Sequence, residues 1–392
     1  MSKIQAITAR QILDSRGNPT IEVDLVLDCG SIGRGIVPSG ASTGKLEALE
    51  LRDKNDSIYL GQSVYESVNK INNDIVKNID KKQIYTQESL DQLLINLDGT
   101  ENKSKLGANS ILGVSLAFAW AISASQKIPL YKSFSANDYS LPVPMMNIIN
   151  GGAHANNNLD FQEFMILPIG FDSFSECLRA GVEIFHNLKS CLNKLSMSTA
   201  VGDEGGFAPN IASNEEALDI IIDAIQSAGY KPGKEVYLGL DVASSEFFNN
   251  GKYILSNGKQ YDNNGFCQYL DELSSKYPII TIEDGMSEDD WNGWSMLTKQ
   301  LGDKLQLVGD DVFVTNPKIL NKGIKENIGN AILIKFNQIG TITETLETIN
   351  LAKQNNYSCI ISHRSGETED TTISDLAVAT SSGQIKTGSV SR

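Results

Sequence analysis

Six apolar segments in the second half of the chain each end in one ionisable residue, and their spacing suggests shared chemistry. The segments are EVYLGLD, PIITIED, LQLVGDD, AILIKFN, SCIISHR and GQIKTGS. Their terminal ionisable residues are, in chain order, Asp241, Glu283, Asp310, Lys335, His363 and Lys386. Successive members lie 42, 27, 25, 28 and 23 positions apart. A strand with its helix and loops needs about 30 residues, so one strand-end position recurs in successive βα units.

Three of these residues are carboxylates on consecutive predicted strands. In a (β/α)8 barrel the carboxyl ends of the strands meet at one mouth, where active sites lie. Asp241, Glu283 and Asp310 would repel one another there, which favours a hard divalent cation, and an all-oxygen set favours Mg2+ over zinc. Lys335 interrupts the apolar run AILIKFNQIG, and a nearby cation is expected to help lower its pKa toward that of a general base. Any one of these residues alone is more simply a solvated strand end; the series argues for a site.

Composition and charge narrow the class of protein. The 392 residues are 41% hydrophobic and 21% charged, which suits a soluble globular protein with a large core. A net charge of -15 and the absence of a basic stripe argue against nucleic acid as a partner. The longest apolar stretch, 110–125, contains several serines and predicts a buried helix without membrane insertion. The N-terminus does not resemble a signal peptide, and the five cysteines form no CxxC pair, so a reducing cytoplasmic location is expected.

The chain has two parts that differ in their predicted order of strands and helices. TIEVDLVL and SIGRGIV predict an antiparallel hairpin, and helical periodicity follows, so residues 1–138 are expected to form a smaller α+β domain that caps the site. Prolines and paired glycines in YSLPVPMMNIINGG mark the predicted domain boundary. Strands then alternate with amphipathic helices, which predicts an α/β catalytic barrel domain over 139–392.

The motifs of the chain, in order, resemble those of the enolase family. They are DSRGNPT, VPSGASTG, MMNIINGGAHANN, QEFM, GDEGGFAPN, TIEDG, VGDD, LIKFNQIGT, SHRSGETED and QIKTGS, and they cover nearly the whole chain. The resemblance implies a lyase of glycolysis, a phosphopyruvate hydratase that interconverts 2-phosphoglycerate and phosphoenolpyruvate with Mg2+. It also implies a modified (β/α)8 TIM-type barrel whose first units depart from regular alternation.

The resemblance assigns metal-binding and proton-transfer roles. Asp241, Glu283 and Asp310 are similar to the ligands of a first Mg2+, and Ser42 resembles a ligand of a second, supplied when its loop closes over substrate. Lys335 is similar to the base that removes the C2 proton. Glu204 resembles the acid that protonates the leaving C3 hydroxyl, with Glu163 assisting. An acid of this kind needs a raised pKa, which desolvation and the neighbouring Glu163 are expected to give Glu204.

The remaining roles concern substrate binding. The residues that resemble substrate-binding groups of the family are His154, Gln162, His363, Arg364, Ser365 and Lys386. The guanidinium fork of Arg364 suits a phosphate, and Lys386 suits the negative charge that develops on a substrate carboxylate. His186 lies at helical spacing and is interpreted as a packing or surface residue.

The chain as given ends six residues after Lys386, whereas enolases continue with further helical sequence, so the last barrel helix is expected to be missing. Glu22 resembles a dimer-interface residue whose partner lies in that segment, while a second family contact, Arg10 with Glu183, is present, so a homodimer or higher homo-oligomer is expected. Two alternatives stay open. One is another enolase-superfamily enzyme, such as a racemase or cycloisomerase, against which GDEGG and SHRSGETED argue; the other is a non-catalytic descendant that serves as a binding or structural protein.

Overall fold

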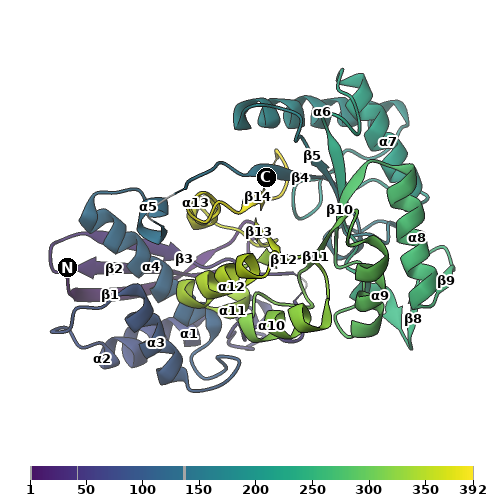
Figure 1. Ribbon diagram of the computed structural model, residues 1–392. Helices are drawn as coiled ribbons and strands as arrows, with labels where there is room; N and C mark the ends of the chain where they lie inside the picture. The colour runs from purple at the N-terminus through teal and green to yellow at the C-terminus, as the bar shows by residue number, and fades with distance from the viewer. Residues whose placement is uncertain (1, 42, 136–137, 392) are drawn as a thin grey trace.

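The first part of the chain is an antiparallel sheet packed against helices (Figure 1). The computed structural model describes residues 2–41, 43–135 and 138–391. The strands, paired in chain order, are β1 (Ile4–Leu13), β2 (Pro19–Leu27) and β3 (Ile32–Ile36). The helical elements are η1 (Tyr59–Gly61), α1 (Tyr65–Asn69), η2 (Lys70–Ile75), α2 (Val76–Asn78), α3 (Gln87–Asp98), α4 (Ala108–Gln126) and α5 (Leu130–Phe134). The predicted β2–β3 hairpin is confirmed.

Helix α4 is the core of this domain. It is long and apolar enough to cross a membrane, but 78% of its apolar window is buried inside the protein, so the predicted buried helix is confirmed. It packs on β2 and β3. A Cβ on Gly33 would lie 2.0 Å from the Ala117 carbonyl oxygen, so only glycine permits this close approach of strand and helix.

The second part is a closed eight-stranded barrel. Its strands are β4 (Val143–Asn150), β5 (Glu163–Leu167), β6 (Tyr237–Asp241), β10 (Ile279–Glu283), β11 (Gln306–Gly309), β12 (Ala331–Ile334), β13 (Ser358–Ser362) and β14 (Gly383–Lys386). They pair in this order and close through β14 and β4. Strand β5 runs antiparallel to both neighbours, and all other pairs are parallel, which confirms the modified barrel.

Helices and short segments connect the strands. They are η3 (Gly152–His154), α6 (Phe174–Lys194), α7 (Asn214–Ser227), η4 (Ser244–Phe247), β7 (Phe248–Asn249), β8 (Lys252–Ile254), β9 (Gln260–Tyr261), α8 (Asn263–Lys276), α9 (Trp291–Leu301), α10 (Pro317–Glu326), α11 (Phe336–Ile339), α12 (Ile342–Gln354) and α13 (Thr372–Ala379). Helices α6 to α10 and α12 each begin at a side chain that accepts a backbone N–H bond, namely Ser173, Ser213, Asp262, Asp290, Asn316 and Thr341. Such caps fix where each helix starts and hence how each strand end is held. His186 is exposed on α6.

Strand alternation determines which side chains reach the mouth of the barrel. A buried apolar cluster that includes Val308 of β11 and Leu333 of β12 is separate from the main core. Side chains two positions apart on a strand share a face. Asp310 and Lys335 therefore continue the rows of Val308 and Leu333 and end at the mouth. This periodicity explains why an ammonium group follows an otherwise apolar strand.

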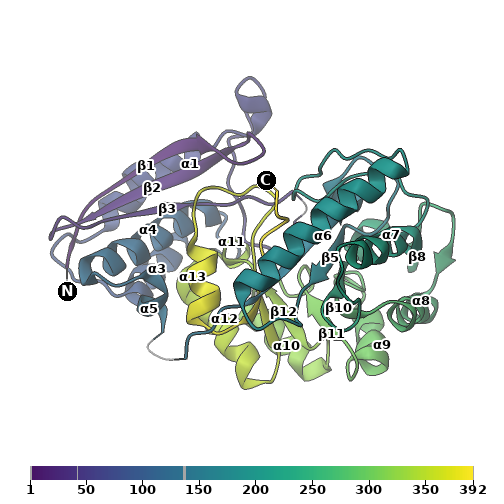
Figure 2. The same ribbon diagram turned by 90° about the horizontal axis from the view of Figure 1, so that it is seen from above.

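The two parts are in direct contact through the last third of the chain. Helix α11 contacts α4, α12 contacts α3, and α13 contacts α5. Figure 2 shows α12 and α13 beside the helices of the first domain, with α6 to α9 on the far side of the barrel. Residues after β14 return to the mouth, where Ser389 donates a backbone hydrogen bond to the Glu204 carbonyl oxygen (3.0 Å).

Candidate active site

The structure gathers the predicted site residues at the mouth of the barrel. Ser42 lies outside the described residues, so its predicted role stays a prediction. Register pairs Glu163 of β5 with Asp241 of β6, and Asp241 with Glu283 of β10, so three carboxylates stand side by side on neighbouring strands. One small cavity is lined by His154, Gln162, Glu163, Glu204, Asp241, Lys335, Ser362, His363, Arg364, Ser365 and Lys386. Glu283 and Asp310 join the same cluster through the two lysines.

Lys386 is the electrostatic centre of this group. Its buried Nζ lies 2.9 Å from both carboxylate oxygens of Glu283, 3.0 Å from Glu163 Oε2 and 3.4 Å from Asp241 Oδ2. Burial alone would lower the pKa of Lys386, but Glu163, Glu283 and Asp241 outweigh it and hold that pKa well above its usual value. Gln162 supports the arrangement because its Nε2 donates to Asp241 Oδ2 (3.1 Å).

Lys335 pairs with the third predicted metal ligand. Its Nζ donates to Asp310 Oδ2 at 2.5 Å. Burial favours the neutral amine, but attraction to Asp310 prevails and raises the pKa of Lys335 above its ordinary value. Burial raises and Lys335 lowers the pKa of Asp310, with a net decrease. Both shifts favour the charged forms of the pair.

The pKa shifts of the two predicted acid groups, Glu204 and Glu163, differ from the expectation. Glu204 Oε2 lies 3.4 Å from His363 Nε2, and Glu204 Oε1 lies 3.5 Å from His154 Nδ1. Burial favours the protonated acid, but the two imidazoles hold the pKa of Glu204 well below its usual value, so the prediction of a raised pKa there is wrong for this arrangement. Burial and repulsion from Glu204 instead raise the pKa of Glu163 well above its usual value. Of the two carboxyls, Glu163 is therefore the one whose protonated form the surroundings favour. Burial also lowers the pKa of His154.

Arg364 is buried against a partner that the sequence analysis did not single out. Its NH1 lies 3.0 Å from Glu47 Oε2 and its NH2 lies 3.2 Å from Glu47 Oε1, which is a bidentate ion pair. Glu47 lies in TGKLEALEL, just after the VPSGASTG motif and 317 positions from Arg364. The chain offers no spacing signal for such a contact; the only hint was an acidic residue next to a predicted lid.

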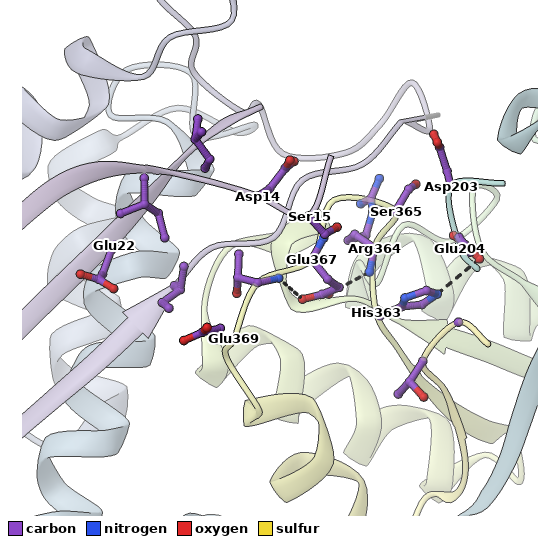
Figure 3. Close-up of a pocket in the computed structure, with 16 residues that line it drawn as sticks. Asp14, Ser15, Glu22, Asp203, Glu204, His363, Arg364, Ser365, Glu367 and Glu369 are labelled. Carbon is purple, nitrogen blue, oxygen red and sulfur yellow. Dashed lines mark hydrogen bonds and ion pairs between the residues drawn. The ribbon is translucent and has the colours of Figure 1, made fainter. Parts of the chain in front are cut away.

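Two cavities meet at this site. The small cavity described above has a volume of about 10 Å³, room for about one water molecule. A larger cavity of about 550 Å³ shares Glu204, His363, Arg364 and Ser365 with it and extends to the β1–β2 hairpin (Figure 3). Figure 3 shows His363 directed at Glu204 on one side of this cavity and Glu22 on the other. A ligand larger than water therefore enters the small cavity only when side chains or loops around it move.

Comparison with known families agrees with this architecture. A model described as the enolase N-terminal domain matches residues 4–134, and one described as the enolase C-terminal TIM barrel domain matches residues 138–392. The chain belongs to the enolase family. The motif resemblance is thereby confirmed over nearly the whole chain, and the buried mouth cluster lies in the enolase barrel domain.

The enolase barrel has a donor set that fits a divalent cation. Four buried carboxylates, those of Glu163, Asp241, Glu283 and Asp310, share the ammonium groups of Lys335 and Lys386 as their lysine partners among the described residues. Neutral amides of Gln162 and Gln338 also donate to Asp241 and Asp310, and His154 Nδ1 lies 3.5 Å from Glu163 Oε1. Burial and repulsion from Asp241 raise the pKa of Glu283 well above its usual value, as expected for a carboxylate short of positive charge. Oxygen donors of this kind suit Mg2+.

The most compact groups of potential ligand atoms in the enolase site are not the predicted triad. Among the described residues, two groups of three have potential ligand atoms that all lie within 4.8 Å of one another. One group is His154, Glu163 and Glu204, and the other is Asp284, Asp310 and Asp311. Asp284 already accepts the backbone N–H groups of Asp310 and Asp311, each at 3.0 Å. The predicted triad is spread because Lys386 lies between Asp241 and Glu283 while Lys335 holds Asp310.

Glu367, on the wall of the larger cavity, gives a pH-dependent prediction. Burial raises the pKa of its carboxyl from 4.5 to about 7. Because the folded-state pKa exceeds the unfolded one, the free energy of unfolding is expected to fall by about 3 kcal/mol as pH rises through this interval. Glu367→Gln should remove most of that fall, which urea unfolding at pH 5 and pH 8 measures. The exposed Glu369→Gln is the control, and a Glu367→Gln variant with the wild-type pH dependence would contradict the prediction.

Proposed function

We propose that this enolase-family chain catalyses the reversible dehydration of 2-phosphoglycerate to phosphoenolpyruvate with Mg2+. The observation that carries the proposal is the opposition of two groups across one cavity. Glu163 is on β5 and Lys335 follows β12, and these strands lie four places apart in either direction around the eight-stranded barrel. A base and an acid on opposite sides suit removal of a proton from one carbon and of a hydroxyl from the next.

The proton on C2 of the substrate is very weakly acidic because it lies next to a carboxylate. Lys335 is the base in this proposal. Burial of its side chain favours the neutral amine that the step needs, Asp310 outweighs it and raises the pKa, and Mg2+ held by Asp310 would weaken that effect. Removal of the proton by Lys335 places extra negative charge on the substrate carboxylate, which Lys386 at the mouth stabilises. Bound Mg2+, held by Asp241, Glu283 and Asp310, would supply further positive charge there.

Loss of the C3 hydroxyl needs a proton donor on the other side. The pKa of the Glu163 carboxyl is raised, and Glu204 lies beside it, in contact with His154 and His363. We assign the donation to this pair as a unit, because strongly coupled carboxyls titrate together. Arg364 and Ser365 would bind the substrate phosphate at the edge of the cavity.

Absorbance growth from phosphoenolpyruvate on addition of 2-phosphoglycerate and Mg2+ tests the proposal. Turnover that a chelator abolishes and added Mg2+ restores would support it. A folded chain that binds Mg2+ without turnover would favour the non-catalytic alternative. Turnover of a non-phosphorylated acid in place of 2-phosphoglycerate would favour another enolase-superfamily reaction.

We also propose a cytoplasmic homodimer. The side chains of Arg10 and Glu183, which resemble a family interface contact, are 42% and 43% exposed and are accessible to a partner. Sedimentation at micromolar concentration should give twice the chain mass of 42.7 kDa, and Arg10→Ala should shift the equilibrium toward the monomer. A monomeric mass for the unchanged chain would refute this assignment.

A further inference from the structure

Gln338 occupies a central place in the site although neither its type nor its position suggested a role. It lies in the short helix α11, directly after Lys335, and its side chain is buried. Its Nε2 donates to Asp310 Oδ1 at 2.8 Å and to Glu47 Oε1 at 3.2 Å. Its Oε1 accepts the hydroxyl of Thr315 at 2.7 Å. Because carboxylates only accept hydrogen bonds, the amide can satisfy both only in this orientation.

Each partner of Gln338 leads to a different functional group. Asp310 is the carboxylate paired with Lys335. The Thr315 hydroxyl accepts the backbone N–H of Lys335 at 2.9 Å. Glu47 forms the bidentate pair with Arg364. The side chain of Gln338 therefore hydrogen-bonds to the partner of the proposed base, Asp310, and to the partner of Arg364, Glu47.

Gln338 also anchors the segment that follows the predicted lid. The backbone N–H of Ala48 donates to the Gln338 carbonyl oxygen at 2.8 Å. Glu47 in turn accepts the backbone N–H of Gly44 at 3.1 Å. The N-terminal domain is thus bonded to both the backbone and the side chain of one barrel residue.

We propose that Gln338 is a positioning residue that holds the metal-ligand carboxylate of Asp310 and, through Glu47, the guanidinium of Arg364 in one arrangement. The inference rests on the proposed function, because it takes Asp310 as a magnesium ligand and Arg364 as an anion site. Removal of an outer partner of a metal ligand typically costs about 10- to 100-fold in metal affinity or activity. Gln338→Met keeps about the length of the side chain, removes its side-chain hydrogen bonds and leaves the backbone bond to Ala48 in place.

The test measures Mg2+ binding to the substrate-free chain by calorimetry. Gln338→Met is expected to weaken Mg2+ affinity by about 10- to 100-fold. The matched control is Gln87→Met, because Gln87 Nε2 also donates to a buried carboxylate, that of Asp91 (3.1 Å), but Gln87 lies in the N-terminal domain and lines neither cavity of the site. It should keep wild-type Mg2+ affinity at a similar cost in melting temperature. Unchanged affinity in Gln338→Met, or an equal loss in Gln87→Met, overturns the inference.

A second variant keeps the test valid should Gln338→Met fail to fold. In our proposal Glu47 acts on Asp310 only through Gln338, so Glu47→Gln should weaken binding of inorganic phosphate and, by a smaller factor, of Mg2+. Where Gln338→Met does fold, the Mg2+ effect of Glu47→Gln should vanish in the double variant. Unchanged affinities for both ions in Glu47→Gln, or fully additive effects in the double variant, would overturn the coupling.

The outcome separates this inference from the proposed reaction. The readout is ion binding, so a wild-type chain that binds Mg2+ without turnover refutes the reaction and leaves the Gln338 comparison intact. A wild-type chain that turns over substrate while Gln338→Met binds Mg2+ normally refutes the positioning role alone.

Discussion

Lys335→Ala is expected to lower kcat by about 100- to 10,000-fold, the range typical of a lost general base. The reason is local: Lys335 is the amine of the cavity that lies opposite Glu163 across the barrel. Binding of Mg2+ should persist or strengthen, because Asp310 loses the ammonium that lies 2.5 Å from its Oδ2. Turnover of 2-phosphoglycerate and calorimetry with Mg2+ measure the two effects separately.

The control for this prediction is Lys103→Ala. Lys103 is also buried and pairs with a carboxylate, that of Glu344 at 3.0 Å, but it does not line the cavity. The Lys103→Ala variant should be less stable than the wild type and should keep the wild-type kcat. If Lys335→Ala retained more than a tenth of wild-type kcat, Lys335 would not be the base, and the proton-transfer assignment would have to move to another group.

The sequence was a good guide where periodicity and chain order determine position. Asp241, Glu283 and Lys386 end their strands, and Asp310 and Lys335 follow theirs by one residue, as the spacing predicted. This success has a simple physical cause. Parallel strands in a closed barrel must present their carboxyl ends at one mouth, so a repeated strand-end position becomes a cluster in space.

The sequence was a poor guide where pairing depends on the folded arrangement. Glu47 meets Arg364 across 317 positions, and Gln338 meets Glu47 across 291. The predicted rise in the pKa of Glu204 was wrong for the same reason. Its direction depends on where the His154 and His363 rings lie, and neither periodicity nor motif order specifies a ring position.

A second consequence of the fold is that the site concentrates buried charge. Lys386 contacts Glu163, Asp241 and Glu283, and all four side chains are at least 96% buried. Removing one partner from a buried ionic group leaves charges that water cannot reach, which typically costs about 3–5 kcal/mol. The ammonium of Lys386 is therefore expected to stabilise the fold as well as the proposed reaction.

Lys386→Met is accordingly expected to lose both turnover and stability. Methionine is similar in length and uncharged, so the carboxylates around it lose their shared cation. In the metal-free chain we expect the free energy of unfolding to fall by about 3–5 kcal/mol at neutral pH, with a loss of kcat of at least about 100-fold. Urea unfolding with a chelator present and the phosphoenolpyruvate assay measure the two losses.

The pH and ion dependence of the Lys386→Met defect identify its cause. The pKa values of Glu283 and Glu163 already lie above their usual values, and loss of the lysine should raise them further, so the deficit should shrink as pH falls toward about 4.5 and grow as pH rises. Added Mg2+ should raise the melting temperature of Lys386→Met more than that of the wild type, because the ion replaces lost positive charge. Lys103→Met, which removes a pairing with Glu344 outside the cavity, should show no such gain. A Lys386→Met defect independent of pH and Mg2+ would mean that Lys386 acts through packing, and the charge argument for the site would fail with it.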